Sequence, residues 1–261
     1  MSGRPVDEFT VGSLFAGIGG FDLGFTRAGF RVEWQVEIDP WCRRVLAKHW
    51  PDTRRWPDVR TFPPDPSDEW PGGSVVDVVV GGDPCQGNSN AGSVYKREHE
   101  DLGREFVRIV DVLRPRVVVR ENPYPSRPGA LWPWWRMRAE LERLGYAVLP
   151  FRLRSCCLGA HHRRDRVFLL GEFPDPDGDG LEGVHGEGFP SRHTRGVCRD
   201  GGGAGGREHG LPAPRVCRSR DEVPHLVDRL RGLGNAVDPV VAEWIAGRVM
   251  AAMGRGMGGR T

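Results

Sequence analysis

The chain has 261 residues, which is enough for one sizeable α/β core with a smaller appendage but too few for two full domains. Its net charge is only +2, and all but two of its basic residues are arginines, so nucleic-acid binding is permitted but not demanded. None of the six cysteines has CxxC spacing, which disfavours a zinc cluster or a disulfide framework, and no apolar stretch has membrane-spanning length. Because the first residues lack a signal-peptide core, we expect a cytoplasmic protein.

The first predicted unit is a strand over residues 9–15, a glycine-rich turn and a helix over 21–28. Backbone at such a turn can approach a nucleotide-like ligand closely. Gly17 and Gly19 match the start of a dinucleotide fingerprint, but Asp22 stands at its last glycine position. A nicotinamide or flavin site and an S-adenosylmethionine site are therefore equally open on these residues alone.

A second predicted strand, residues 31–37, ends on Glu37, 20 residues after Gly17. An acid at that distance typically accepts hydrogen bonds from ribose hydroxyls, although a solvated Glu is the ordinary alternative. Ile38 is placed to cover one face of an adenine. Asp39 begins the next predicted helix as its N-cap.

Residues 51–73 are rich in proline and predict loop rather than helix. The Val-rich run over 74–80 then predicts a buried parallel strand. Cys85 follows its C-terminal end, where open α/β sheets bind ligands, and Pro84 fixes the approach to it. A lone Cys at such a turn is otherwise an ordinary small apolar residue.

The remaining pattern predicts helices over 102–113, 131–144 and 239–253, and strands over 116–123, 146–154 and 166–171. Glu121 ends one of these strands, and parallel strand order would bring it close to Cys85. Arg164 and Arg166 are two apart, so in extended chain they project on one side of the sheet, as partners of an acid or as a phosphate-binding cluster. Asp175 and its neighbours resemble a calcium loop only in part, and we expect no metal site.

Together these motifs resemble the cytosine-C5 DNA methyltransferases, in their bacterial or phage form. Residues 81–92 are similar to the family's nucleophile loop, G-G-x-P-C-Q-x-x-S, and residues 13–21, Ser-Leu-Phe-Ala-Gly-Ile-Gly-Gly-Phe, to its first cofactor motif. Glu-Asn at 121–122 resembles the catalytic acid motif, and residues 234–239 match Gly-Asn-x-Val-x-Pro. The motifs occur in the family's order.

The family's arginine motif, Gln-x-Arg-x-Arg, has its counterpart at residues 162–166. The resemblance implies that Arg164 orients Glu121 and that Arg166 holds the cytosine carbonyl. Two positions depart from the pattern: His162 replaces the Gln, and Pro123 stands where the family usually has Val.

The resemblance also implies the other contacts. Cys85 is the nucleophile and Glu121 the acid. The implied cofactor contacts to S-adenosylmethionine are Phe15, Gly17, Ile18, Gly19, Glu37, Ile38, Asp58, Val59, Asp83, Pro84, Leu102, Asn235 and Val237. The implied substrate contacts are Gln86, Ser89 and Asn122. Asp58 would bind the adenine amino group.

The fold implied is a doubly wound, mostly parallel α/β sheet with a small recognition domain. We expect residues 1–171 to form the catalytic and cofactor-binding domain, 172–224 a short Gly/Pro-rich and partly disordered recognition region, and 225–261 a segment whose helix returns to the catalytic domain. The expected partner is double-stranded DNA, bound by a monomer in a bacterial cell or phage-infected host. Other hypotheses are an RNA cytosine-C5 methyltransferase, a non-catalytic DNA-binding homologue and a nicotinamide-dependent oxidoreductase.

Overall fold

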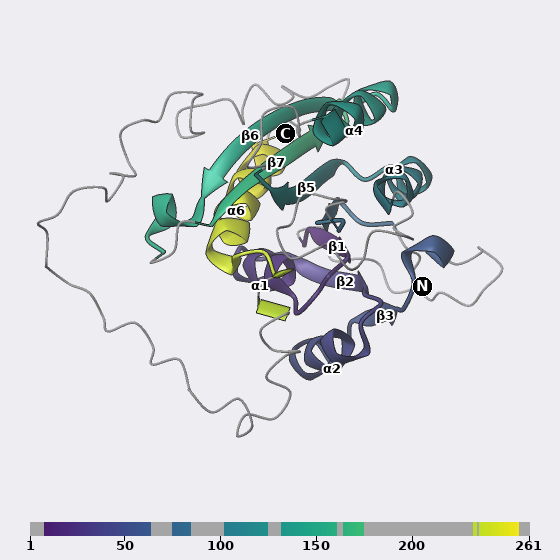
Figure 1. Cartoon of the computed structure of the whole chain (residues 1–261), viewed down its shortest axis with the longest axis vertical. Coiled ribbons are helices and arrows are strands. Elements are labelled where there is room, and N and C mark those ends of the chain that lie inside the picture. The colour runs from purple at the N-terminus through teal and green to yellow at the C-terminus, as the bar shows by residue number, and fades with distance from the viewer. Residues whose placement is uncertain are drawn as a thin grey trace, which may run out of the picture.

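The computed structural model describes residues 8–63, 75–84, 102–124, 132–160, 164–174, 232–233 and 235–255 (Figure 1). Three predicted site residues, Cys85, Gln86 and Ser89, lie outside these ranges, as does nearly all of the expected recognition region. Among the described residues, none of the helices combines the length and apolar character that crossing a membrane requires.

The described strands form one seven-stranded sheet in the order β3-β2-β1-β4-β5-β7-β6. The strands are β1 (Thr10–Leu14), β2 (Arg31–Val36), β3 (Arg54–Trp56), β4 (Val78–Gly81), β5 (Val117–Pro123), β6 (Ala147–Arg154) and β7 (Asp165–Glu172). Only β7 runs antiparallel to its neighbours, β5 and β6. The chain order reverses between β1 and β4, and ligands bind at such switch points, beyond the carboxyl ends of the strands. The expected doubly wound, mostly parallel sheet is confirmed.

Helices cover both faces of the sheet. They are α1 (Gly20–Arg27), α2 (Pro40–His49), α3 (Leu102–Leu113), α4 (Trp132–Arg143) and α6 (Pro239–Arg255), with short 3-10 turns η1 (Val59–Thr61) and η2 (Ser155–Leu158). Because side chains alternate along a strand, each strand contributes to two cores. Val78 and Phe168 pack with α1 and α6, whereas Val79 and Leu169 pack with α3 and α4 (Figure 1).

The last helix, α6, lies against α1, although more than 200 residues separate them in the sequence. Two glycines on α1 allow the close approach. A Cβ at Gly20 would lie 2.2 Å from the carbonyl oxygen of Val237, and one at Gly24 would lie 2.4 Å from Cβ of Ala242. The C-terminal segment therefore packs directly beneath the glycine turn that follows β1.

The segment after α2 differs from expectation. Residues 51–73 predict loop, yet Arg54–Trp56 form the edge strand β3, paired in parallel with Trp34–Val36 of β2. Three residues are too few to show a strand's alternation, and the strand is held by its neighbour rather than by its own pattern. The other predicted elements agree with the structure to within about two residues, apart from the start of β4, which is normal for element ends.

Candidate active site

An acid and an arginine meet where β5 and β7 run side by side. Nε of Arg166 lies 2.5 Å from Oε1 of Glu121, and the Glu121 side chain is only 7% exposed. The two strands are antiparallel, with Glu121 opposite Phe168 and Pro123 opposite Arg166. Residues two apart share a face, so Arg166 and Phe168 lie on the Glu121 side of the sheet.

The surroundings of Glu121 place the pKa of its carboxyl group near neutral pH. Burial raises the pKa of Glu121 to about 7, because the low-dielectric interior disfavours the charged form. The positive charges of Arg166, Arg164 and Arg120 act in the opposite direction and lower that pKa. At neutral pH the carboxyl group is therefore present in both forms, which suits a group that shares a proton with a substrate atom.

Arg164 contacts the segment that leads into α6. Its guanidinium donates hydrogen bonds to the carbonyl oxygens of Ala236 and Leu233. Arg166 makes a direct ion pair with Glu121, and the role of Arg164 in orienting Glu121 stays a prediction. Arg164 precedes β7, which directs it toward the C-terminal segment, whereas Arg166 lies within the strand beside Glu121. Its charge still lowers the pKa of Glu121.

Asp83 and Asn122, expected at the cofactor and the substrate, have their side chains turned to each other. Arg120 donates from Nε and a terminal nitrogen to the two oxygens of Asp83, at 2.5 and 2.8 Å, and Nδ2 of Asn122 donates to the same carboxylate at 3.2 Å. All three side chains are buried. A buried arginine needs a counter-ion, and Asp83 supplies it. Pro84, the next residue, is exposed.

The glycine turn after β1 is tied to Glu37 at the end of β2. Oε2 of Glu37 accepts a hydrogen bond from the amide of Gly17 at 2.7 Å, and Oε1 accepts one from the amide of Asp39 at 2.8 Å. Burial raises the pKa of Glu37, and these two amide bonds lower it. An ionised carboxylate has about four acceptor sites, so Glu37 can still accept from a ligand.

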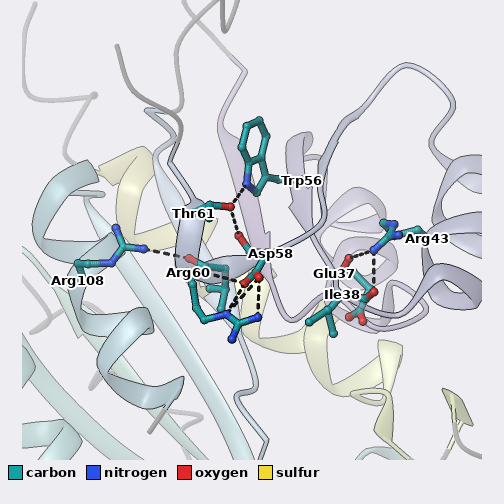
Figure 2. A network of polar contacts seen from close by, with 9 residues as sticks. Glu37, Ile38, Arg43, Trp56, Asp58, Arg60, Thr61 and Arg108 are labelled. Carbon is teal, nitrogen blue, oxygen red and sulfur yellow. Dashed lines mark hydrogen bonds and ion pairs between the residues drawn. The ribbon is translucent and has the colours of Figure 1, made fainter. Parts of the chain in front are cut away.

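The glycine turn is open as far as the described residues go. Gly17 has a φ of +56°, and a Cβ built on it would meet no atom of those residues within 4 Å. Ile38 is 63% exposed, although it is a large apolar side chain beside the half-buried Glu37. Arg43 donates to the carbonyl oxygens of Glu37 and Ile38, at 2.9 and 2.7 Å, and so fixes the backbone that presents Ile38 (Figure 2). An acid, an exposed apolar side chain and an open glycine turn fit a nucleoside.

Asp58 is engaged by a neighbour that the sequence pattern does not reveal. Its Oδ1 accepts from Nε of Arg60 at 3.0 Å, and its Oδ2 accepts from Nε and a terminal nitrogen of Arg60 at 3.1 and 2.7 Å (Figure 2). Oδ1 also accepts from the Arg60 amide, as the cap of η1. Arg108 on α3 holds η1 in place through the carbonyls of Val59 and Phe62. The predicted adenine contact of Asp58 thus competes with Arg60.

The other predicted cofactor residues fall into two groups. Val59 and Val237 are buried in the two cores, and Leu102 packs against the α3 and α4 core, so these side chains serve packing. Phe15, Ile18, Gly19 and Asn235 lie around the glycine turn or on the segment before α6, and Asn235 is exposed. Phe15 has a φ of +53° and Gly19 one of +88°.

The family model for C-5 cytosine-specific DNA methylases matches residues 9–177, which is more than half of the chain. The chain belongs to the C-5 cytosine-specific DNA methylase family. The resemblance seen in the sequence is thereby confirmed.

Among its relatives, type II methyltransferase M1.HphI of Haemophilus parahaemolyticus is 35% identical over 188 residues, covering 65% of this chain and 49% of that protein. Type II methyltransferase M.DdeI of Desulfomicrobium norvegicum is 33% identical over 167 residues, 60% of this chain and 39% of that protein. The chain thus spans about half or less of the length of these relatives. A prophage-encoded protein of E. coli, solved as a candidate DNA modification methyltransferase, aligns with a TM-score of 0.52 at 26% identity, over 64% of this chain and 47% of that one.

Proposed function

We propose that this chain is an S-adenosylmethionine-dependent DNA (cytosine-5-)-methyltransferase that forms a covalent adduct through Cys85. The observation that carries the proposal is the ion pair between the buried Glu121 and the half-buried Arg166, at the carboxyl end of β5 and next to the end of β4, the strand that leads into Pro-Cys-Gln. The proposed substrate is double-stranded DNA, acted on by a monomer in the cytoplasm of a bacterial cell or phage-infected host. Membership of the methylase family supports this reading.

Carbon 5 of cytosine is a poor nucleophile, so the ring must be activated first. The Cys85 thiolate adds to carbon 6 and breaks the 5,6 double bond, while the Glu121 proton is shared with ring nitrogen 3, where negative charge develops. Carbon 5 would then take the methyl group from S-adenosylmethionine as the methyl–sulfur bond breaks and S-adenosylhomocysteine is released. Transfer of the carbon 5 proton to water and departure of the Cys85 sulfur would restore the ring.

Glu121 suits the acid role because of its surroundings. A carboxyl group with its pKa raised to about 7 keeps a proton at neutral pH, whereas an ordinary surface Glu is ionised. Arg166 holds one carboxyl oxygen and so directs the other toward the substrate. Arg166 also places a fixed positive charge where the cytosine carbonyl would lie.

The residues around the glycine turn fit the cofactor. Glu37 would accept hydrogen bonds from the ribose hydroxyls, Ile38 would cover the adenine, and the open backbone at Gly17 would admit the methionine end. Bound S-adenosylmethionine supplies an electrophilic methyl group. These residues, which lie at the ends of β1 and β2, would hold it across the switch point from Glu121.

The target base must leave the duplex, because the attacked ring face is covered in stacked DNA. Flipping a base costs a few kcal/mol, which contacts to the extruded base and the backbone offset. Arginines are suited to those contacts, since their forks match phosphate oxygens and base edges. Among the described residues, Arg152 and Arg154 lie at the end of β6, and Arg164 and Arg166 lie just before and at the start of β7, the strand paired with Glu121 of β5.

The test is covalent trapping. DNA containing 5-fluorocytosine is incubated with the protein and S-adenosylmethionine, and the products are resolved on a denaturing gel. The adduct is released only when the proton on carbon 5 is lost, and fluorine at carbon 5 cannot be lost in this way. The wild type should therefore remain bonded to the DNA, and Cys85→Ser should not. Trapping by both proteins refutes the role of Cys85. Methyl transfer to transfer RNA alone, with none to duplex DNA, refutes the proposed substrate.

A further inference from the structure

The backbone pairing between β4 and β5 ends at Arg120, one residue before Glu121, the proposed catalytic acid. Its paired residues run from Val78 opposite Val117 to Gly81 opposite Arg120. Beyond this point β5 continues to Pro123 paired only with β7. The turn that follows β4 is joined to β5 by side chains instead: Arg120 holds both oxygens of Asp83, and Asn122 holds one of them.

The Arg120–Asp83 ion pair is buried, and its main effect is to fix the distance and orientation between β5 and the turn after β4. The side chains of Arg120 and Asp83 are 5% and 8% exposed, and the Arg120 guanidinium lies 4.9 Å from the centre of the Trp134 ring. A buried ion pair is often no more stabilising than apolar residues of similar volume, because removing two charges from water is costly. A two-point fork between planar groups does, however, fix distance and orientation in a way that apolar packing does not.

The opposite side of the same turn touches the acid. A Cβ built on Gly82 would lie 2.9 Å from Oε2 of Glu121 and 3.2 Å from its carbonyl oxygen. Gly82 therefore faces Glu121 while Asp83, one residue on, faces Arg120. A small shift of this turn would therefore displace the Glu121 carboxyl group directly.

We propose that Asp83 and Arg120 are positioning residues, which hold the turn after β4 at a fixed place relative to the Glu121 carboxyl group. The inference rests on the proposed function, in which Cys85, two residues after Asp83, and Glu121, one residue after Arg120, act on the same base. Neither Asp83 nor Arg120 touches the reacting atoms. The two-point contact between their side chains keeps the turn that leads to Cys85 at a constant position relative to Glu121.

The central variant replaces both charges at once, as Asp83→Leu with Arg120→Met. Because the pair is removed together, no unpaired buried charge is left, and the thermal unfolding midpoint should stay near the wild-type value. We expect kcat for methyl transfer to fall by roughly ten- to a hundredfold, the effect of a small misplacement of reacting groups. KM for DNA and the affinity for S-adenosylhomocysteine should change by less than about twofold, since the Asp83 carboxylate is engaged by Arg120 and Asn122 and not held out toward a ligand.

Two further variants separate positioning from charge balance. Arg120→Lys keeps the positive charge but cannot form the fork, so its kcat should fall as well. The paired control is Arg138→Met with Glu142→Leu, which removes an ion pair from the outer surface of α4 and should leave kcat unchanged. Wild-type kcat in both the double variant and Arg120→Lys overturns the proposal. A loss of S-adenosylhomocysteine affinity matching the loss of kcat assigns Asp83 to the cofactor and also overturns it.

One readout needs no activity. The carboxyl carbon of Glu121, assigned in NMR spectra with Glu121→Gln, should titrate at about pH 7 in the wild type. The positive charges that lower its pKa are those of Arg166, Arg164 and Arg120. The double variant removes Arg120 together with its counter-ion Asp83, so the net charge near Glu121 is unchanged, and a changed titration reports a displaced carboxyl group. A wild type that methylates no cytosine refutes the proposed function alone. An unchanged titration in the double variant overturns the positioning role, whether or not the wild type is active.

Discussion

Arg166 and Glu121 face each other across two antiparallel strands, with Nε of the arginine 2.5 Å from Oε1 of the acid. The partner that most lowers the pKa of this acid is therefore fixed in a strand rather than in a loop. Burial nevertheless outweighs it, and the net pKa of Glu121 is raised to about 7. The site thus keeps a proton available while holding the carboxyl group in one orientation.

The rate of methyl transfer should follow the ionisation of Glu121. Above pH 7 the carboxyl group loses its proton and can no longer share it with nitrogen 3, so kcat/KM, which reports the free enzyme, should fall on the alkaline side with a pKa of about 7. Glu121→Gln has no such proton to lose; its rate should be lower by a factor of about 10² to 10⁴ and should lack this limb. Initial rates measured across the neutral range test both statements. An alkaline limb that survives in Glu121→Gln belongs to another group and contradicts the assignment.

Gly82 should tolerate no side chain. A Cβ there would lie 2.9 Å from Oε2 of Glu121 and 3.2 Å from its backbone oxygen, and the backbone cannot move aside as a flexible side chain can. Gly82→Ala should therefore lower kcat for methyl transfer by roughly tenfold or more, through displacement of the acid.

The matched control is Gly247→Ala in α6, where a Cβ would meet no atom within 4 Å. Alanine is the better helix former by about 1 kcal/mol, so this variant should be as active as the wild type and slightly more stable. Equal kcat values for the two variants would show that the turn after β4 can adjust without moving Glu121.

Much of the site follows from sequence because its residues lie at element ends. Gly17 and Glu37 could be placed together from a strand, a turn and a spacing of 20 residues, and the structure joins them by a hydrogen bond. Glu121 and the arginines could be brought together only through the family resemblance, because Glu121 lies near the end of its predicted strand and Arg166 at the start of its own. The two meet because β7 runs antiparallel to β5.

The side-chain partners could not be predicted. Arg120 and Asn122 lie in a strand beside the acid, and nothing in their spacing shows that both turn to Asp83. The Arg60 contact to Asp58 depends on the 3-10 turn η1, which forms in a proline-rich segment and is held from α3 by Arg108. Such contacts depend on tertiary packing, and a single sequence shows no pattern from which they can be predicted.

Asp22 should make the protein less stable as the pH rises. It is fully buried at the start of α1 and accepts hydrogen bonds from Ser13 and Gln35, and burial raises its pKa from 3.8 to about 6. Between these two values the folded protein binds more protons than the unfolded chain. The contribution of Asp22 to the free energy of unfolding is therefore complete below about pH 4 and is lost as the pH rises through 6; it is on the order of 3 kcal/mol.

Asp22→Asn removes this titration but keeps an acceptor for Gln35 and a group that can pair with the Ser13 hydroxyl. The difference in free energy of unfolding between the variant and the wild type should grow in favour of the variant as the pH rises from about 4 to about 6. Urea unfolding at several pH values measures it. Parallel curves for the two proteins would mean that Asp22 is ionised at both ends of this range.

Arg60 should weaken cofactor binding, because it occupies both oxygens of Asp58 (Figure 2). The pair lowers the pKa of Asp58 and is partly exposed, with side chains 48% and 27% accessible, so the competition is modest. Such surface pairs contribute up to about 1 kcal/mol. Arg60→Ala should therefore bind S-adenosylhomocysteine up to about fivefold more tightly in a calorimetric titration.

A double-mutant cycle shows whether the gain passes through Asp58. Asp58→Ala should bind more weakly than the wild type, because the carboxylate expected to meet the adenine amino group is gone. Adding Arg60→Ala to Asp58→Ala should then bring no further gain, since no carboxylate is left for Arg60 to occupy. If Arg60→Ala alone binds S-adenosylhomocysteine more weakly than the wild type, Arg60 contacts the cofactor itself, and its ion pair with Asp58 supports binding instead of opposing it.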